Sequence, residues 1–425
     1  ITFVLNEKQI FPIKTATSCR LKWSWSSLIL TTGETDSCHR SSKSFLTPDN
    51  FDNFHNTPEK IRDRKKMLEG KWPGHGCEYC KNLEQAGGRS DRQFQNTVPG
   101  VYPKELNKDQ TLTKVKPTVI EVIFNNTCNF ACIYCKSSVS SKIEQEDKKF
   151  GENLWTLHTG KKDIYKRQDE ISKKLNPLFF KWLEKNVTTI QRLQILGGEP
   201  LVQKEFYDVI DIIKRNPNKE LELNVVSNLN IPSKQFNKFV DTINDLLKTR
   251  SIKRFDINAS VEGFGPEQEY VRYGFNTDLF NKNFEYMLNN SVFRLGFLST
   301  ITALTLKTMP RFIDQLNEWK KVKNVYWYPH MVLPIKESVL STVNFDYEVF
   351  ANEVKYVNDN YQIKNIDDKN SLDLFNGIAT QIQSQPSDPQ KVKDLTNFLS
   401  AVDRRRNLNW TKTFPWLKTY VGENK

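Results

Sequence analysis

From Pro117 to about residue 335, short apolar runs alternate with longer segments of helical pattern. Six apolar runs have the length of strands: 118–124, 190–196, 221–227, 254–261, 293–301 and 324–332. The segments between them, such as 204–215 and 233–248, carry apolar residues at helical spacing. Strands that alternate with helices indicate a parallel sheet built from βα units. We therefore expect an α/β fold with a partial, TIM-like (β/α)6 barrel; a doubly wound sheet is the alternative that periodicity leaves open.

The remainder of the chain has a different texture. The N-terminal part is irregular, with a predicted hairpin over 24–40 and a helix that begins near Pro58. The C-terminal part is predicted to form two or three helices. We expect three domains: a Cys-rich N-terminal domain over 1–115, a barrel over 116–335 and a helical C-terminal extension over 336–425.

Composition excludes several classes of protein. Of the 425 residues, 38% are hydrophobic and 12% aromatic, which suffices for a core and argues against general disorder. No stretch approaches the run of about 18 apolar residues that marks a membrane span. The N-terminus also lacks a basic segment followed by an apolar run, so we expect a cytoplasmic protein. The net charge of +12 favours an acidic partner, such as nucleic acid, an acidic peptide or an anionic ligand.

All seven cysteines lie in the first third of the chain. Three of them, Cys128, Cys132 and Cys135, fall in the loop after the first predicted strand. An odd number of cysteines argues for metal ligation or catalysis rather than a disulfide framework. Parallel sheets place their sites at the carboxyl ends of strands, where this loop lies. Three thiolates can hold three corners of a [4Fe–4S] cluster and leave the fourth iron open; zinc is the alternative, and it would need a fourth ligand nearby.

The CxxxCxxC spacing, with Tyr134 before the last cysteine, resembles that of the radical S-adenosylmethionine (SAM) enzymes. The resemblance covers roughly residues 117–335 and implies a partial (β/α)6 barrel. It also implies that Cys128, Cys132 and Cys135 bind a [4Fe–4S] cluster whose open iron is chelated by SAM. In that family, an electron from the reduced cluster cleaves SAM to methionine and a 5′-deoxyadenosyl radical, which abstracts a hydrogen atom from the substrate.

The sequence LGGEPL, at the end of the second predicted strand, matches the GGE motif of that family. The resemblance implies that Gly197 and Gly198 let the backbone approach SAM closely. It also implies that Glu199 lies near the SAM amino group. A buried glutamate at the start of a helix is the alternative for Glu199.

Loops after three later strands supply the remaining SAM contacts that the resemblance implies: Ser227, Asn228, Ser260, Glu262, Arg272 and Val332. Ser227 and Asn228 are expected to contact the ribose or carboxylate of SAM. Ser260 and Glu262 are expected to face the ribose. Arg272 is expected to pair with the SAM carboxylate, because the guanidinium fork binds a carboxylate through two hydrogen bonds; a surface helix residue is the alternative. Val332 is expected to pack against the adenine, and a core strand position is its alternative. No residue is singled out as a catalytic acid or base.

The four early cysteines form a second set: Cys19, Cys38, Cys77 and Cys80. Radical SAM enzymes often carry an auxiliary [4Fe–4S] cluster in a twitch or SPASM domain, and four thiolates are enough to saturate one. Those domains usually follow the barrel, whereas these cysteines precede it. The resemblance implies an auxiliary cluster here; a structural zinc site fits a CxxC with two distant cysteines equally. His39 and His75 lie beside these cysteines and could replace one of them.

Stretches such as WPGHGCEYC and AGGRSDR resemble a less characterised group of twitch-domain radical SAM proteins. The nearest chemistry attached to that group is the modification of ribosomally made peptides. The resemblance thus implies a peptide or protein substrate, an external electron donor and, since no leader-binding module is visible, a small leader-binding partner protein. RNA is the alternative substrate that the charge suggests, although no RNA-binding signature is present. A zinc-stabilised binding protein without enzymatic activity is the third hypothesis.

Overall fold

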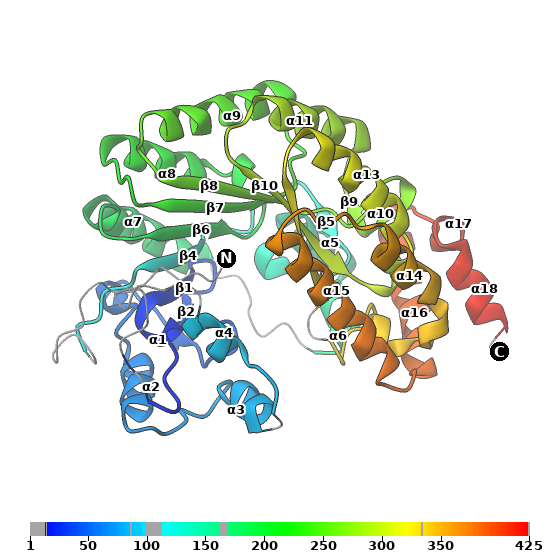
Figure 1. Cartoon of the computed structure of the whole chain (residues 1–425), viewed down its shortest axis with the longest axis horizontal. Helices are drawn as coiled ribbons and strands as arrows, with labels where there is room; N and C mark the ends of the chain where they lie inside the picture. Colours follow the sequence, from blue (N-terminus) through cyan, green and yellow to red (C-terminus); the bar gives the residue numbers. More distant parts are fainter. Residues whose placement is uncertain are drawn as a thin grey trace.

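The computed structural model describes residues 13, 15–85, 87–97, 113–161, 169–332 and 335–423. Its centre is a nine-stranded sheet in the order β11-β10-β8-β7-β6-β4-β1-β2-β3 (Figure 1). The six strands expected from the sequence are all present: β4 (Val119–Ile123), β6 (Arg192–Leu196), β7 (Glu222–Ser227), β8 (Arg254–Ala259), β10 (Arg294–Ile301) and β11 (Val325–Met331). They pair in parallel and in chain order. The predicted α/β fold with a parallel central sheet is confirmed, and the order lacks the reversal of a doubly wound sheet, as in a barrel wall.

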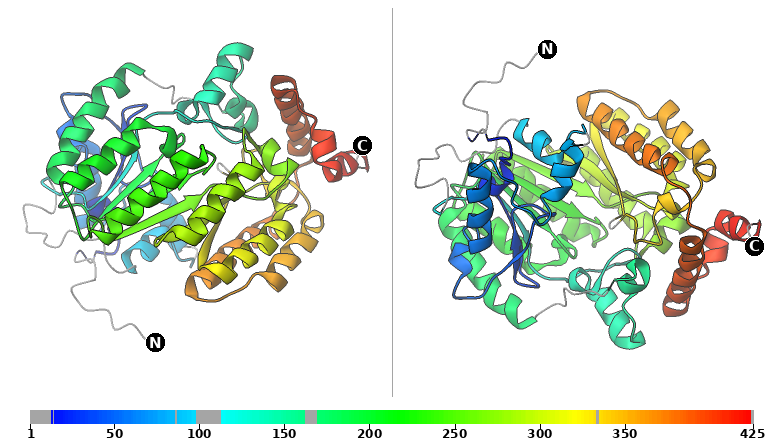
Figure 2. Two further views of the ribbon diagram at one scale, coloured as in Figure 1. Left: turned by 90° about the horizontal axis from the view of Figure 1, so that it is seen from above. Right: turned by 90° about the horizontal axis from the view of Figure 1, so that it is seen from below.

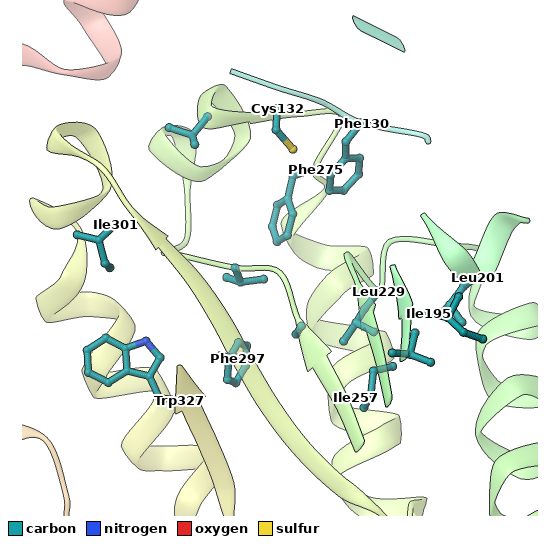
Figure 3. Packing of buried hydrophobic residues seen from close by; sticks show 14 of the residues in the cluster. Phe130, Cys132, Ile195, Leu201, Leu229, Ile257, Phe275, Phe297, Ile301 and Trp327 are labelled. Atoms are coloured by element: carbon teal, nitrogen blue, oxygen red, sulfur yellow. The ribbon is translucent and has the colours of Figure 1, made fainter. Parts of the chain in front are cut away.

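Helices that follow the strands cover one face of this sheet: α8 (Lys204–Arg215), α9 (Ser233–Lys248), α11 (Thr277–Asn290) and α13 (Met309–Val322). Figure 2 shows the green helices in front of the sheet from above and the blue N-terminal elements in front of it from below. Phe239 of α9 packs edge-on against Phe255 of β8, with ring centroids 5.9 Å apart. Figure 3 shows part of this core. Buried and partly buried side chains alternate along β6, β7 and β8. The buried ones face the helices, so the partly buried ones face away from them.

The N-terminal part joins the same sheet. β1 (Trp25–Ile29) runs parallel to β4. β2 (Glu34–Asp36) pairs antiparallel with β1, and the edge strand β3 (Ser44–Phe45) pairs antiparallel with β2. The predicted hairpin is therefore confirmed, and so is the predicted helix, which is α2 (Pro58–Leu68). The described residues of this part also form three shorter helices: α1 (Leu21–Ser24), α3 (Glu78–Gln85) and α4 (Asp91–Thr97). The domain boundaries stay a prediction, since β1 places the N-terminal part in one sheet with the parallel strands that follow it.

Two groups of helices lie outside the βα units. Between β4 and β6 the chain forms α5 (Ser141–Phe150), α6 (Leu154–Thr159) and α7 (Asp169–Asn186). The described residues of the C-terminal part form α14 (Ala351–Asn360), α15 (Ile366–Gln383), α16 (Pro389–Arg406), α17 (Trp410–Thr413) and α18 (Pro415–Glu423). The predicted helical character is confirmed, whereas the predicted number of two or three helices was too low. Arg406 at the end of α16 pairs with Glu146 of α5 at 2.9 Å, so the C-terminal helices are tied to the segment that follows β4. Among the described helices, none has both the length and the apolar character that crossing a bilayer requires.

Candidate functional site

Three cysteines lie on the loop that follows β4, here called the cysteine loop (125–136), beyond the carboxyl end of that strand. Figure 3 shows Cys132 on this loop beside Phe130 and Phe275. Within the loop, β5 (Ala131–Cys132) pairs antiparallel with β9 (Arg272–Tyr273), which sets Cys132 opposite Arg272. The backbone N–H of Cys128 donates to Ser141 Oγ at 3.1 Å. The loop is therefore fixed at its start by α5 and in its middle by β9.

The three thiols of this loop lie close enough to influence one another. Burial raises the pKa of each thiol, and Cys132 raises those of Cys128 and Cys135 further. The pKa of Cys135 reaches about 12. Thiols of raised pKa stay protonated at neutral pH until a cation takes the place of the proton. Three thiols on one partly buried loop are the donor type that an iron–sulfur cluster takes.

In the described ranges, no three His, Cys, Asp or Glu side chains converge closely enough to hold one metal ion. An iron–sulfur cluster makes a different demand, because its thiolates bind separate iron atoms and stand further apart than the ligands of a single ion.

The two glycines after β6 let the chain press against the cysteine loop. Gly197 and Gly198 both have positive φ, 81° and 57°. A Cβ on Gly198 would lie 2.3 Å from the carbonyl oxygen of Thr127, and one on Gly197 would lie 2.3 Å from Cγ2 of Ile123. The next residue, Glu199, donates its backbone N–H to the same Thr127 oxygen at 2.9 Å. Only glycine fits this approach, which explains the paired glycines by local geometry.

Glu199 joins the ends of β6 and β7. Its Oε1 accepts from Leu201 N at 3.0 Å and from Ser227 Oγ at 2.7 Å, and its Oε2 accepts from Asn228 N at 2.6 Å. Glu199 also caps the 3-10 helix η5 (Pro200–Val202). It is therefore a buried glutamate at the start of a helix, as the alternative to a SAM contact described it. Burial raises the pKa of Glu199 to about 7 in spite of these three hydrogen bonds. A carboxylate accepts about four hydrogen bonds, so capacity for one more donor remains.

The polar residues after β7 and β8 hold these strand ends to the cysteine loop. Asn228 donates to Asn129 Oδ1 at 2.7 Å, and Asn129 in turn donates to the carbonyl oxygen of Asn230 at 2.8 Å. The backbone N–H of Ser260 donates to the carbonyl oxygen of Ser227 at 2.8 Å. The structure thus brings Ser227, Asn228 and Ser260 to one edge of the sheet beside the cysteine loop.

Arg272 is buried in β9, so the alternative of a surface helix residue is wrong. Its Nε donates to Glu262 Oε2 at 2.7 Å, and its Nη2 donates to Oε1 of the same carboxylate. Tyr134 and the backbone N–H of Thr300 also donate to Oε1, each at 3.1 Å. The remaining nitrogen, Nη1, lies 3.6 Å from Cys132 Sγ. A hydrogen-bonded chain therefore runs from the cysteine loop through Arg272 to Glu262.

Sequence reasoning placed Arg272 and Glu262 on different groups of SAM and missed their ion pair. The two residues are separated by α10 (Pro266–Val271), and no local pattern marks them as partners. A buried ion pair needs further hydrogen bonds to offset its desolvation, and Tyr134 and Thr300 supply them here. Val332 is buried at the end of β11 with its N–H donating to the carbonyl oxygen of Ile301 at 3.1 Å, which is the core strand position given as its alternative.

The four early cysteines line one small cavity in the N-terminal part, together with Lys22 and Arg92: Cys19, Cys38, Cys77 and Cys80. Burial raises the pKa of Cys19 to about 12 and that of Cys77 to about 11. Lys22 is also buried and forms an ion pair with Asp63 at 2.8 Å. Neither His39 nor His75 lines the cavity. The donor set is thus four thiols beside three cationic side chains, since Arg40 also lines the cavity, and four thiols around one cavity could hold an iron–sulfur cluster.

No protein family profile and no curated protein matches this sequence. Solved structures that are similar include three of SuiB from Streptococcus suis. The one bound to precursor peptide SuiA covers 80% of this chain and 68% of the SuiB chain, with 12% identity and a TM-score of 0.35. The structure bound to S-adenosylmethionine and a further SuiB structure each cover 84% of this chain and 68% of the SuiB chain. Both have 12% identity and a TM-score of 0.36. Superpositions at that level do not establish a common function.

Proposed function

We propose that this chain is a radical SAM enzyme that modifies a peptide or protein. The observation that carries the proposal is the gathering of Cys128, Cys132 and Cys135 on one partly buried loop at the carboxyl edge of a parallel sheet. That loop contains no fourth cysteine or histidine, so three thiolates would leave one iron of a [4Fe–4S] cluster open. The bound cluster would supply the electron that cleaves SAM to methionine and a 5′-deoxyadenosyl radical, which takes a hydrogen atom from the substrate.

The residues around the cysteine loop would bind and orient SAM. Glu199 has capacity for one more hydrogen bond and would accept it from the SAM amino group. Ser227 and Asn228 would face the ribose or carboxylate, and Ser260 the ribose. Of the three Arg272 nitrogens, only Nη1 is not bonded to Glu262, so Arg272 would reach the SAM carboxylate through that nitrogen.

Two of the expected SAM contacts would act mainly as supports. Glu262 accepts hydrogen bonds from Arg272, Tyr134 and Thr300, so it would fix the direction of the Arg272 guanidinium. Val332 would shape the wall near the adenine from its position at the end of β11.

The second set of cysteines would hold an auxiliary [4Fe–4S] cluster. The four thiols gather round one cavity, and the cations Lys22, Arg40 and Arg92 in its wall would offset the negative charge of a cluster bound by four thiolates. Zinc would satisfy the same four ligands, and metal analysis separates the two.

A peptide or protein is the proposed substrate class because the stretches outside the barrel resemble peptide-modifying radical SAM proteins. An external electron donor and a small leader-binding protein are the proposed partners. RNA is the alternative substrate, favoured by the net charge of +12.

The experiment is metal analysis after anaerobic reconstitution of the full chain. We expect about eight iron atoms per chain with matching sulfide, which corresponds to two clusters. The triple variant C128A/C132A/C135A and the quadruple variant C19A/C38A/C77A/C80A should each retain about four iron atoms. Iron in neither set, or zinc alone in the wild type, would overturn the proposal.

A further inference from the structure

A second arginine lies near the cysteine loop, and it comes from the end of α16. Arg406 is the last residue of that helix, and its side chain is fully buried. Its Nε donates to Glu146 Oε1 at 2.9 Å, and its Nη2 donates to Oε2 of the same carboxylate at 3.0 Å. Its guanidinium carbon lies over the ring of Tyr273, 5.1 Å from the ring centroid. A carboxylate and an aromatic ring therefore fix the position of this buried cation.

The third nitrogen of the Arg406 guanidinium is a buried donor that lacks a partner. Nη1 is buried, and among the described residues it has no hydrogen-bond acceptor. Nε and Nη2 share one edge of the planar guanidinium, so Nη1 lies at the corner opposite Glu146. A buried polar group without a partner costs free energy, so such groups normally bond to protein, ordered water or a ligand. The missing partner of Nη1 is an acceptor.

This donor is close to the middle of the cysteine loop. Tyr273, over which the guanidinium lies, stands in β9 directly opposite Ala131 of β5, the residue before Cys132. Burial raises the pKa of Cys132, whereas the charges of Arg272 and, to a lesser degree, Arg406 lower it. The positive charge of Arg406 therefore acts on the sulfur atom of Cys132.

Arg272 is held in the same way as Arg406. Its Nε and Nη2 donate to Glu262, and its remaining nitrogen, Nη1, lies 3.6 Å from Cys132 Sγ. Each of the two arginines thus uses the same two nitrogens for one carboxylate and keeps the third for another acceptor. The third nitrogen of Arg272 has a sulfur atom as its neighbour. A sulfur atom of a bound cluster is the corresponding acceptor for Nη1 of Arg406.

We propose that Arg406 donates through Nη1 to a sulfur atom of the cluster held by the cysteine loop, and that its charge makes this cluster easier to reduce. The inference rests on the proposed function, because it requires a cluster at Cys128, Cys132 and Cys135. Reduction adds one electron from the external donor, and therefore one negative charge, to a cluster already bound by three thiolates. A buried cation stabilises the more negative state, and hydrogen bonds to cluster sulfur also set the potential.

The neighbouring residue Arg405 offers a matched comparison. Its Nη1 pairs with Asp147 of α5 at 3.0 Å, and its Nη2 donates to the carbonyl oxygen of Glu152. Arg405 thus ties α16 to the same segment as Arg406 does, but both of its terminal nitrogens already have acceptors. A role confined to holding α16 in place would belong to both arginines, whereas a bond to the cluster would belong to Arg406 alone.

The test is a redox titration of the anaerobically reconstituted full-length protein, followed by electron paramagnetic resonance of the reduced clusters. The signal that changes when SAM is added reports the cysteine-loop cluster, because SAM binds its open iron. We expect Arg406→Gln to make reduction of this cluster about tenfold less favourable, which lowers its midpoint potential by about 59 mV for a one-electron couple. Iron and sulfide content should equal those of the wild type.

Three further variants separate the charge of Arg406 from its structural role. Arg406→Lys keeps a positive charge and should recover at least half of the lost potential. Glu146→Gln breaks the same ion pair but keeps the arginine, so its potential should equal or exceed that of the wild type. Arg405→Gln removes the neighbouring cation and its tie to α5, and should leave the potential at the wild-type value.

An unchanged potential in Arg406→Gln with its iron retained would overturn this inference and leave the proposed function intact. A fall in potential in Glu146→Gln would also overturn it, because the ion pair rather than the charge would then be responsible. This second variant decides the question if Arg406→Gln does not fold. A wild-type protein without iron at the cysteine loop would overturn the proposed function as well, so iron content distinguishes the two failures.

Discussion

At the scale of single residues, Glu199 links the ends of two strands and also has capacity to accept one further donor. We expect Glu199→Gln to weaken SAM binding about tenfold, since an amide oxygen is a poorer acceptor than a carboxylate. The iron content should stay unchanged. The measurement is SAM titration of the reconstituted protein, with the exposed Glu220→Gln as the matched control. Wild-type affinity in the Glu199 variant would remove this residue from the SAM site.

The same residue predicts how SAM binding depends on pH. Burial raises the pKa of Glu199 to about 7, so its carboxyl group is charged above that pH and protonated below it. The charged form is the better acceptor, so SAM affinity should fall as the pH drops through about 7. A flatter profile in Glu199→Gln, measured from pH 6 to 8, would assign the effect to this residue. Identical profiles in the two proteins would contradict the assignment.

Gly198 offers a test of the contact between β6 and the cysteine loop. Gly198→Ala forces a Cβ to 2.3 Å from the carbonyl oxygen of Thr127 at a φ of 57°. We expect it to lower the free energy of unfolding by about 1–3 kcal/mol and to reduce iron incorporation. Gly377→Ala, in α15 with nothing within 4 Å, is the matched control and should be neutral or slightly stabilising. Urea unfolding of both variants checks this prediction. Equal stability of the Gly198 and Gly377 variants would show that the cysteine loop can shift to accommodate the added Cβ.

At the scale of helices and strands, local patterns predicted the elements but not all of their partners. The six parallel strands from β4 to β11 and the N-terminal hairpin were predicted, because alternation of apolar runs is a local signal. The pairing of β1 with β4 and that of β5 with β9 were not, since each joins segments far apart in the chain. Polar residues at every second strand position suggest exposure to solvent, and only register shows that Glu121, Gln194 and Asn224 stand side by side.

The candidate site divides in the same way. The cysteine spacing and the GGE motif marked residues that the structure brings to one edge of the sheet. The ion pair of Arg272 with Glu262 could not be predicted, because it depends on how α10 turns the chain back to β9.

The N-terminal cysteine set can be tested apart from the SAM site. We expect Cys77→Ala to lower iron from about eight to about four atoms per chain while sparing reductive cleavage of SAM. Turnover of the true substrate should fall, because the second cluster would be lost. Cys128→Ala is the contrasting variant and should lose SAM cleavage. Full substrate turnover in Cys77→Ala would reduce the second set to a dispensable element.

At the scale of the whole molecule, the nine-stranded sheet connects the parts of the chain that hold the two cysteine sets. β1 joins the part that holds the N-terminal cavity directly to β4, the strand that leads into the cysteine loop. At the other side, the C-terminal helix α16 is tied to α5 by Arg405 with Asp147 at 3.0 Å and by Arg406 with Glu146 at 2.9 Å. The segment that follows the cysteine loop is therefore held by the end of the chain.

The central claim is that the cysteine loop binds a cluster with one open iron, and SAM cleavage tests it most directly. The anaerobically reconstituted protein, reduced with dithionite, should convert SAM to 5′-deoxyadenosine and methionine, and C128A/C132A/C135A should form neither. A colourless wild-type protein that leaves SAM intact, or a triple variant that still cleaves it, would contradict the account.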